Sequence, residues 1–276
     1  MDARVIALVA RKEVRDALRN RWFLLYAAGF AVLALALARI SLGDGSAAGF
    51  SGFGRTAASL VNLVILIVPL MGLTLGAGSL AGERERGTLA TLLAQPLTRR
   101  EVLLGKFAGL ALALSAALAL GFGLAGLAVG RAGGAVGVDA YATLVGFTGL
   151  LALAMLALGL LISSLSRQVG AATGVALFTW LGLVFLGDLG LMGTAMTLRL
   201  DVATLLALAL VNPLESFKIA AISGITGSLD VLGPAGAYAS RSFGAGLLPL
   251  LAGLLLAWSL LPLLAAGWIF DARGIR

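Results

Sequence analysis

Four alternating charges stand side by side early in the chain: Glu83, Arg84, Glu85 and Arg86. After Gly87 comes a short apolar helix pattern made by Leu89, Leu92 and Leu93. Pro96 ends that helix, because its ring removes a hydrogen-bond donor and disfavours helical geometry at the preceding residue. Charges beside apolar anchors are suited to binding a soluble partner, whereas an ordinary charged loop between membrane spans has the same composition. The residues alone leave both interpretations open.

The helix that follows has its own start signal. Thr98 is suited to the N-cap position, and Glu101 stands three residues later in capping-box spacing. Residues 82–101 are therefore predicted to form a short helix on the membrane surface between two spanning helices.

The residue types argue against catalysis. The chain has no cysteine and no histidine, so it offers no disulfide, no thiolate or imidazole metal ligand and no histidine base. Gly105-Lys106 lacks the other residues of a phosphate-binding loop. Met192 and Met196, one helical turn apart, fit either a soft Cu(I) contact or apolar filler. We expect no catalytic residue, no metal site and no cofactor bound by this chain.

Composition indicates a multi-pass membrane protein. Of 276 residues, 60% are hydrophobic and 12% are charged, and ~20 apolar helical residues cross the ~30 Å hydrocarbon core. We expect one all-α transmembrane domain, residues 1–276, with six spans at about 22–40, 56–81, 102–130, 140–163, 169–186 and 245–270. Small-xxx-small spacing predicts close helix packing at four pairs, each a weak signal in a glycine-rich chain: Gly72/Gly76, Gly105/Gly109, Gly126/Gly130 and Gly170/Gly174.

Two segments outside the spans have their own patterns. Residues 1–21 have the pattern of a basic amphipathic helix that lies in the membrane interface. Its lipid-facing side would carry Ile6, Ala10, Val14 and Ala17. The alternative is a solvated charged tail. Residues 187–243 mix charges with short apolar runs, of which Val202–Val211 is too short to cross. We interpret this segment as external, with short re-entrant helices.

Orientation follows from the Lys and Arg residues. If both termini are cytoplasmic, the cytoplasmic segments hold 14 of the 20 Lys and Arg residues. The positive-inside rule therefore places residues 82–101 in the cytoplasm. The net charge of +7 has the same origin, and we expect no nucleic-acid partner. The spans are nearly free of ionisable residues, apart from Asp188 at the end of one, so transport would need power from a partner.

The string from Gly82 to Leu89, with Leu92-Leu93, Pro96, Arg99 and Leu103-Leu104-Gly105-Lys106, resembles the coupling-helix signature of type-2 ABC export permeases. That resemblance implies six spans, an N-terminal interfacial helix and re-entrant helices before the last span. It also implies a dimer with a second copy of the chain, on two cytoplasmic ATPase subunits that bind ATP and Mg. The implied ATPase-coupling residues are Glu83, Arg84, Glu85, Arg86, Gly87, Thr88, Leu89, Leu92, Leu93 and Pro96.

A narrower resemblance rests on Arg11-Lys12-Glu13, Arg19-Asn20-Arg21-Trp22, Asn212-Pro213 and Ile222-Ser223-Gly224. These motifs are similar to the NosY-type permeases of the Nos transporter. That transporter supports maturation of the copper-sulfur centre of periplasmic nitrous oxide reductase, with a periplasmic β-helical partner. The candidate partner-binding residues in the external segment are Asp201, Asn212, Pro213, Glu215 and Lys218. A generic exporter of drug, lipid or polysaccharide, and a non-transporting membrane scaffold, remain as alternatives.

Overall fold

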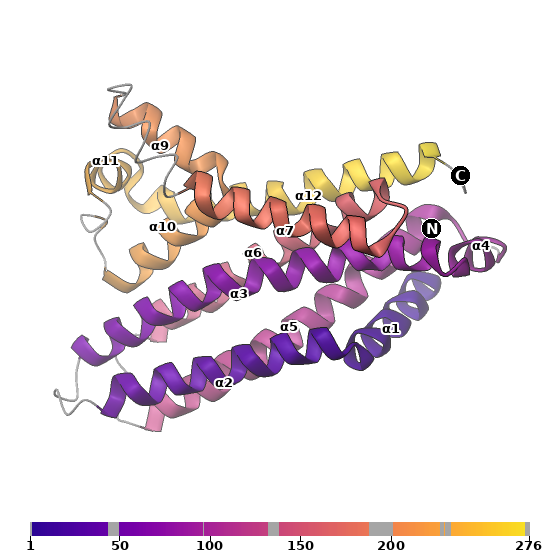
Figure 1. Cartoon of the computed structure of the whole chain (residues 1–276). Helices are drawn as coiled ribbons and strands as arrows, with labels where there is room; N and C mark the ends of the chain where they lie inside the picture. Colours follow the sequence, from indigo (N-terminus) through magenta and orange to yellow (C-terminus); the bar gives the residue numbers. More distant parts are fainter. Residues whose placement is uncertain are drawn as a thin grey trace.

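The computed structural model describes residues 2–43, 50–95, 97–131, 138–187, 201–226, 229 and 233–273. Every regular element in these ranges is helical, as the sequence predicts (Figure 1). The elements are α1 (Ala3–Arg19), α2 (Arg21–Gly43), α3 (Phe50–Glu85), α4 (Thr88–Leu93), α5 (Arg99–Arg131), α6 (Val138–Leu165), α7 (Val169–Phe185), α9 (Val202–Val211), α10 (Pro213–Thr226), α11 (Gly233–Phe243), a 3-10 turn (Gly244–Gly246) and α12 (Leu247–Arg273).

Among the described residues, five helical stretches are long and apolar enough to cross a membrane: Arg21–Ile40, Ala57–Glu85, Arg99–Gly130, Val138–Leu165 and Gly236–Ala272. The apolar helix α7 has 17 residues, and α9 and α10 meet at a bend of 110°. If that bent pair counts as one span, the candidates number six. The chain is thus an all-helical, multi-pass membrane protein.

The helix α3 is longer than predicted. It continues to Glu85, whereas the sequence predicted a span ending at residue 81 and a loop from residue 82. Nothing in residues 82–85 breaks a helix, and the chain turns only at Gly87, where φ is 72°. That left-handed conformation favours glycine. Three of the four alternating charges therefore belong to the last turn of a spanning helix.

Glycines bring α3 and α6 into backbone contact at the centre of the bundle, where α6 lies behind α3 in Figure 1. A Cβ atom on Gly76 would lie 2.6 Å from the carbonyl oxygen of Leu156, and one on Gly159 would lie 2.5 Å from that of Leu73. These distances exclude any side chain, so the close approach of the two helices depends on glycine.

The N-terminal helix α1 is placed differently from the prediction. Its buried side, which includes Val9, Ala10 and Ala17, packs against α5 rather than facing lipid alone. A Cβ atom on Gly109 of α5 would lie 2.4 Å from the carbonyl oxygen of Ala10. The amphipathic pattern correctly predicted an apolar face on α1, but α5, rather than lipid, covers much of that face. Its exposed side carries four arginines with the 68%-exposed Leu8: Arg4, Arg11, Arg15 and Arg19.

At the opposite end of the bundle, α9, α10 and α11 form a compact group (Figure 1). The helix α10 packs against α6 and α12, and Leu214, Phe217 and Ala220 are buried there. The described helices of this segment pack with the bundle and are short, as the sequence predicts.

Candidate functional site

The helices α1 and α4, the start of α7 and the end of α12 meet at one end of the bundle, next to both chain termini (Figure 1). The last turn of α3 enters this region with Glu83, Arg84 and Glu85, and Arg86 follows directly; these four residues are here called the charged turn. The side chains of the charged turn contact different parts of the structure, so the turn is considered residue by residue.

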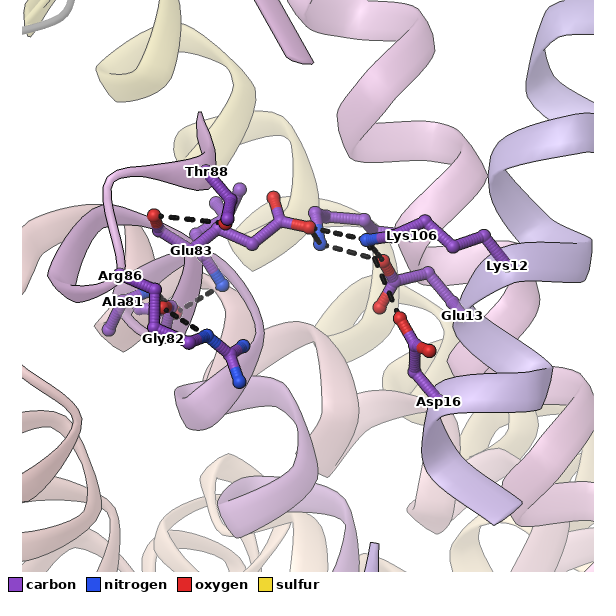
Figure 2. A network of polar contacts seen from close by, with 11 residues as sticks. Lys12, Glu13, Asp16, Ala81, Gly82, Glu83, Arg86, Thr88 and Lys106 are labelled. Atoms are coloured by element: carbon purple, nitrogen blue, oxygen red, sulfur yellow. Dashed lines mark hydrogen bonds and ion pairs between the residues drawn. The ribbon is translucent and has the colours of Figure 1, made fainter. Parts of the chain in front are cut away.

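Glu83 belongs to a closed ring of four charges (Figure 2). Lys12 Nζ lies 2.6 Å from Glu83 Oε1, and Lys106 Nζ lies 2.9 Å from the same atom. The two ammonium groups also contact Glu13 Oε1, at 3.2 Å for Lys12 and 2.8 Å for Lys106. The charge ring of Lys12, Glu13, Glu83 and Lys106 thus alternates in sign around its whole circumference. It joins α1, the end of α3 and the start of α5.

Most of the charge ring is buried. Lys106 is 1% exposed, and Glu13 and Glu83 are each 5% exposed. Burying charges is costly unless each is paired, and losing one partner of a buried pair costs about 3–5 kcal/mol. Burial would lower the pKa of Lys12, but its hydrogen bond to Glu83 and the nearby carboxylate charges raise that pKa above its ordinary value. The Lys12 ammonium therefore remains charged at neutral pH.

Arg84 holds the end of α6. Its Nη1 donates hydrogen bonds to the carbonyl oxygens of Ser163, Ser164 and Ser166, at 2.8, 3.1 and 2.8 Å. The final carbonyl groups of a helix lack partners within the helix, and a cation there is favoured by the helix dipole. The guanidinium also lies 5.9 Å from the ring centroid of Phe270 on α12. Arg84 thereby connects α3 with the α6–α7 turn and with α12.

The remaining two charges complete the set of contacts. Glu85 Oε2 accepts a hydrogen bond of 2.7 Å from the backbone N–H of Val169, the first residue of α7. An acidic group is favoured at a helix N-terminus. Arg86 Nε donates to the carbonyl oxygen of Gly82 at 3.0 Å and caps its own helix. Through three of its four side chains, the charged turn binds α1, α5, α6, α7 and α12.

A serine hydroxyl enters the backbone of α3 one turn before the charged turn. Ser163 Oγ accepts from the N–H groups of Leu80 and Ala81, at 2.9 and 2.8 Å, and donates to the carbonyl oxygen of Ala77 at 2.6 Å. A side chain inserted at this level of a helix is a common site of bending. Ser163 therefore links the end of α6 to the segment of α3 that carries the charged turn.

The six-residue helix α4 has one buried anchor. Leu89 is 3% exposed and packs with Leu80, Leu103 and Phe270. Leu92 and Leu93 are half-buried, whereas Thr88 and Thr91 are exposed. Thr88 Oγ1 donates to the carbonyl oxygen of Glu83 at 3.3 Å, and Gly87 adopts the left-handed turn between the two helices. Pro96 lies outside the described residues.

The predicted capping box at the start of α5 is confirmed. The backbone N–H of Thr98 donates to Glu101 Oε2 at 2.9 Å, and that of Glu101 donates to Thr98 Oγ1 at 3.3 Å. The backbone N–H of Asp2 also donates to Glu101 Oε1 at 2.6 Å. The start of α5 therefore also fixes the beginning of α1.

A cleft of about 990 Å³ opens beside the charge ring. Side chains from α1, α3, α4 and α5 line it, among them Asp16, Arg19, Arg86 and Leu92. Leu92 is half-buried, and its side chain lines this cleft. Among the described residues, no group of three or more Asp or Glu residues is arranged to hold a metal ion.

The candidate residues of the external segment have mostly internal contacts. Asn212 Nδ2 donates to the carbonyl oxygen of Leu183 at 2.6 Å, and its Oδ1 caps the start of α10. Pro213 is buried, and Glu215 pairs with Lys218 at 2.8 Å. Asp201 is exposed, and the Thr204 hydroxyl, by hydrogen bonding to its carboxylate, lowers the pKa of Asp201. Two further candidates of the sequence analysis fall outside the described residues: Asp188 and the Met192–Met196 pair.

Comparison with known proteins decides the family. The family model described as ABC-2 family transporter protein matches residues 7–275. The chain belongs to this family. It is 35% identical over 271 residues to "Probable ABC transporter permease protein NosY" of Stutzerimonas stutzeri, covering 96% of this chain and 97% of that protein. It is 36% identical over 226 residues to the protein of the same name from Pseudomonas aeruginosa, covering 80% and 82%.

These matches confirm the resemblance drawn from the sequence. The chain is a permease subunit of an ABC transporter, and membership implies association with an ATPase subunit. Three residues that sequence reasoning did not assign to the site now complete it: Lys12, Glu13 and Lys106. All three occur within the motifs that carried the resemblance. Their pairing with Glu83 could not be read from those motifs, because it depends on how α1 docks against α5.

Proposed function

We propose that this permease receives the conformational change of its ATPase through the charged turn and α4, and distributes it to the membrane spans. The observation that carries this proposal is that the charged turn binds α1, α5, α6, α7 and α12. Glu83, Arg84 and Leu89 face other parts of the permease, so their role is to position the turn. Arg86, Thr88, Leu92 and Leu93 are the candidates for direct contact with the ATPase.

The proposed assembly has two copies of this permease and two cytoplasmic ATPase subunits that carry ATP and Mg, as in the family resemblance. Glu85 and Gly87 complete the surface toward the ATPase, and Pro96 follows it along the chain. This arrangement leaves the permease itself without a catalytic role. Its part is to convert closure of the ATPase pair into movement of helices within the membrane.

We propose six spans, with α7 as the fifth. Its 17 residues extend ~25 Å at ~1.5 Å per residue, which is at the short end of the range for a membrane helix. The helices α9 and α10 have ten and 14 residues and bend sharply at Asn212, so they form a re-entrant pair on the external side. Both termini are then cytoplasmic, in a bacterial inner membrane.

A reporter fused after Arg276 is expected to read cytoplasmic. One inserted near Gly45 or Gly236 is expected to read external, because the Lys and Arg residues concentrate on the side of the termini. Alkaline phosphatase and a fluorescent protein report the two compartments in opposite senses, so each fusion has its own control. An external C-terminus would contradict the six-span arrangement.

The proposed biological role is maturation of the copper-sulfur centre of periplasmic nitrous oxide reductase. It is supported by the resemblance to NosY-type permeases and by two relatives of that name at 35% and 36% identity. In this role the permease moves a copper or sulfur species, or transmits conformational force across the membrane. A periplasmic β-helical partner would bind the external segment, where Asp201 is the exposed candidate. Asn212, Pro213, Glu215 and Lys218 would then shape that surface from within.

Deleting the permease gene in a host that produces the reductase is expected to leave the reductase in the periplasm without its copper-sulfur centre. The measurement is the visible absorption and the copper and sulfide content of the purified reductase. Complementation with the intact permease controls for effects on neighbouring genes. A strain whose ATPase binds but does not hydrolyse ATP separates the alternatives, because a passive scaffold would still support the centre. A normal centre in the deletion strain would favour the generic exporter.

A further inference from the structure

The charge ring connects the N-terminal helix to the charged turn. Lys12 and Glu13 come from α1, Glu83 from the last turn of α3, and Lys106 from the second turn of α5. Ninety-three residues separate Glu13 from Lys106 along the chain, and 71 separate Lys12 from Glu83. These contacts therefore hold the three helices together at the end of the bundle where α4 lies.

Glu83 depends on the two lysines. Its Oε1 lies within 3 Å of both ammonium groups, and its buried Oε2 has no hydrogen-bond partner among the described residues. A movement of Glu83 alone would leave a buried carboxylate and two lysines without full compensation, which is costly. Movements that carry Lys12 and Lys106 along with Glu83 avoid that cost.

Close backbone packing also holds α1 against α5, in addition to the ion pairs of the charge ring. Gly105 and Gly109 of α5 receive the backbone of α1 so closely that a Cβ atom on Gly105 would lie 2.6 Å from Val9 Cβ. Glu83, on the other side of the ring, precedes the left-handed turn at Gly87 by four residues, so it lies directly next to α4. A displacement of α4 therefore reaches Glu83 through the turn and the Thr88 hydrogen bond, and it reaches α1 through the ring; α5 also packs with α4 through Leu103 and Leu89.

We propose that Lys12, Glu13 and Lys106 are positioning residues that make α1 and the start of α5 move together with the charged turn. The helix α1 is then a moving part of the transmission as well as a helix at the membrane surface. This inference rests on the proposed function, in which the charged turn receives the conformational change of the ATPase.

Two charge-balanced double variants separate the links of the ring. Lys12→Met with Glu83→Gln removes the link to α3 and keeps the 2.8 Å pair between Lys106 and Glu13. Glu13→Gln with Lys106→Met keeps the 2.6 Å pair between Lys12 and Glu83 instead. Each variant loses one positive and one negative charge, so the second is a matched control for the first.

The natural sequence has no cysteine, so label pairs can be introduced without background reactivity. Spin labels at Arg11→Cys and Thr91→Cys, both on exposed residues, report the distance between α1 and α4 in the full chain in nanodiscs. A second pair, at Arg11→Cys and the 61%-exposed Leu112→Cys, reports the distance between α1 and α5. Pulsed electron spin resonance then gives the distribution of each distance.

For the wild-type permease we expect one narrow distribution for each label pair. The Lys12→Met/Glu83→Gln variant is expected to lose the narrow α1–α4 peak and to keep the α1–α5 peak, which also shows that it is folded. The Glu13→Gln/Lys106→Met variant is expected to keep the α1–α4 peak. An unchanged α1–α4 distribution in the first variant, or equal loss in both, would overturn the inference. The ATPase is absent from this measurement, so that result would leave the proposed function standing.

Discussion

Replacing Gly76 with alanine is expected to destabilise the permease by about 3 kcal/mol, the upper end of the range for overpacked cores. The new Cβ atom would lie 2.6 Å from the Leu156 carbonyl oxygen and 2.8 Å from the Leu160 nitrogen. Both atoms belong to the backbone of α6, so no rotation of a side chain can relieve the contact. The two central helices would have to separate, and the packing along their whole length would suffer.

Gly78→Ala is the matched control for this prediction. It lies on the same helix two residues later, and a Cβ atom there would meet nothing within 4 Å. We expect it to be as stable as the wild type. The measurement is the thermal unfolding midpoint of the detergent-solubilised chain, with monodispersity followed by size exclusion. Equal midpoints for Gly76→Ala and Gly78→Ala would show that the α3–α6 contact does not depend on glycine.

The glycine spacing illustrates what the sequence could and could not predict. The pairs Gly72/Gly76 and Gly105/Gly109 lie at close helix contacts, against α6 and α1. At Gly170 and Gly174, which have the same spacing, a Cβ atom would meet nothing within 4 Å. Spacing places two glycines on one face of a helix, but it does not say whether another helix of this chain covers that face.

The positions of the helices along the sequence were more predictable than the contacts between them. Apolar length predicted the long spans, and the Thr98–Glu101 capping box was confirmed because it depends only on residues three apart. The contacts of the charged turn could not be predicted in this way, because the pattern of Glu83 to Glu85 shows where charges are in the sequence and not which residues they contact. Their contact partners, on α1, α5, α6, α7 and α12, are set by tertiary packing.

The same reasoning applies to the external segment. Its charges predicted a surface for a partner, yet Asn212 ties the start of α10 to Leu183 and Glu215 pairs with Lys218 within α10. Composition predicted that the segment is unsuited to lipid, and this stays a prediction, because α9 and α10 together are long and apolar enough to form one broken span. It could not distinguish charges that face a partner from charges that pair within the fold, since both are absent from lipid-facing surfaces.

Changing Leu92 and Leu93 together to alanine is expected to remove most of the ATPase from the purified complex. Both leucines are half-buried in the free permease, so the ATPase can cover what remains exposed. Truncating a central apolar anchor costs about 2 kcal/mol or more, which corresponds to roughly a 30-fold loss of affinity. A single exposed charge pair contributes only about 0.2–1 kcal/mol. Arg86→Ala is therefore expected to weaken association much less.

The control must keep α4 in place. Leu89→Ala is unsuitable, because Leu89 is 3% exposed and anchors α4 to its own bundle. Leu8→Ala with Leu18→Ala removes two exposed leucines, 68% and 53% exposed, from α1 at the same end of the bundle. Co-purification of the ATPase with each solubilised variant, at matched expression, is the measurement. If the Leu92/Leu93 variant retains the ATPase as the α1 variant does, α4 only connects α3 to α5, and the non-transporting scaffold becomes the better account.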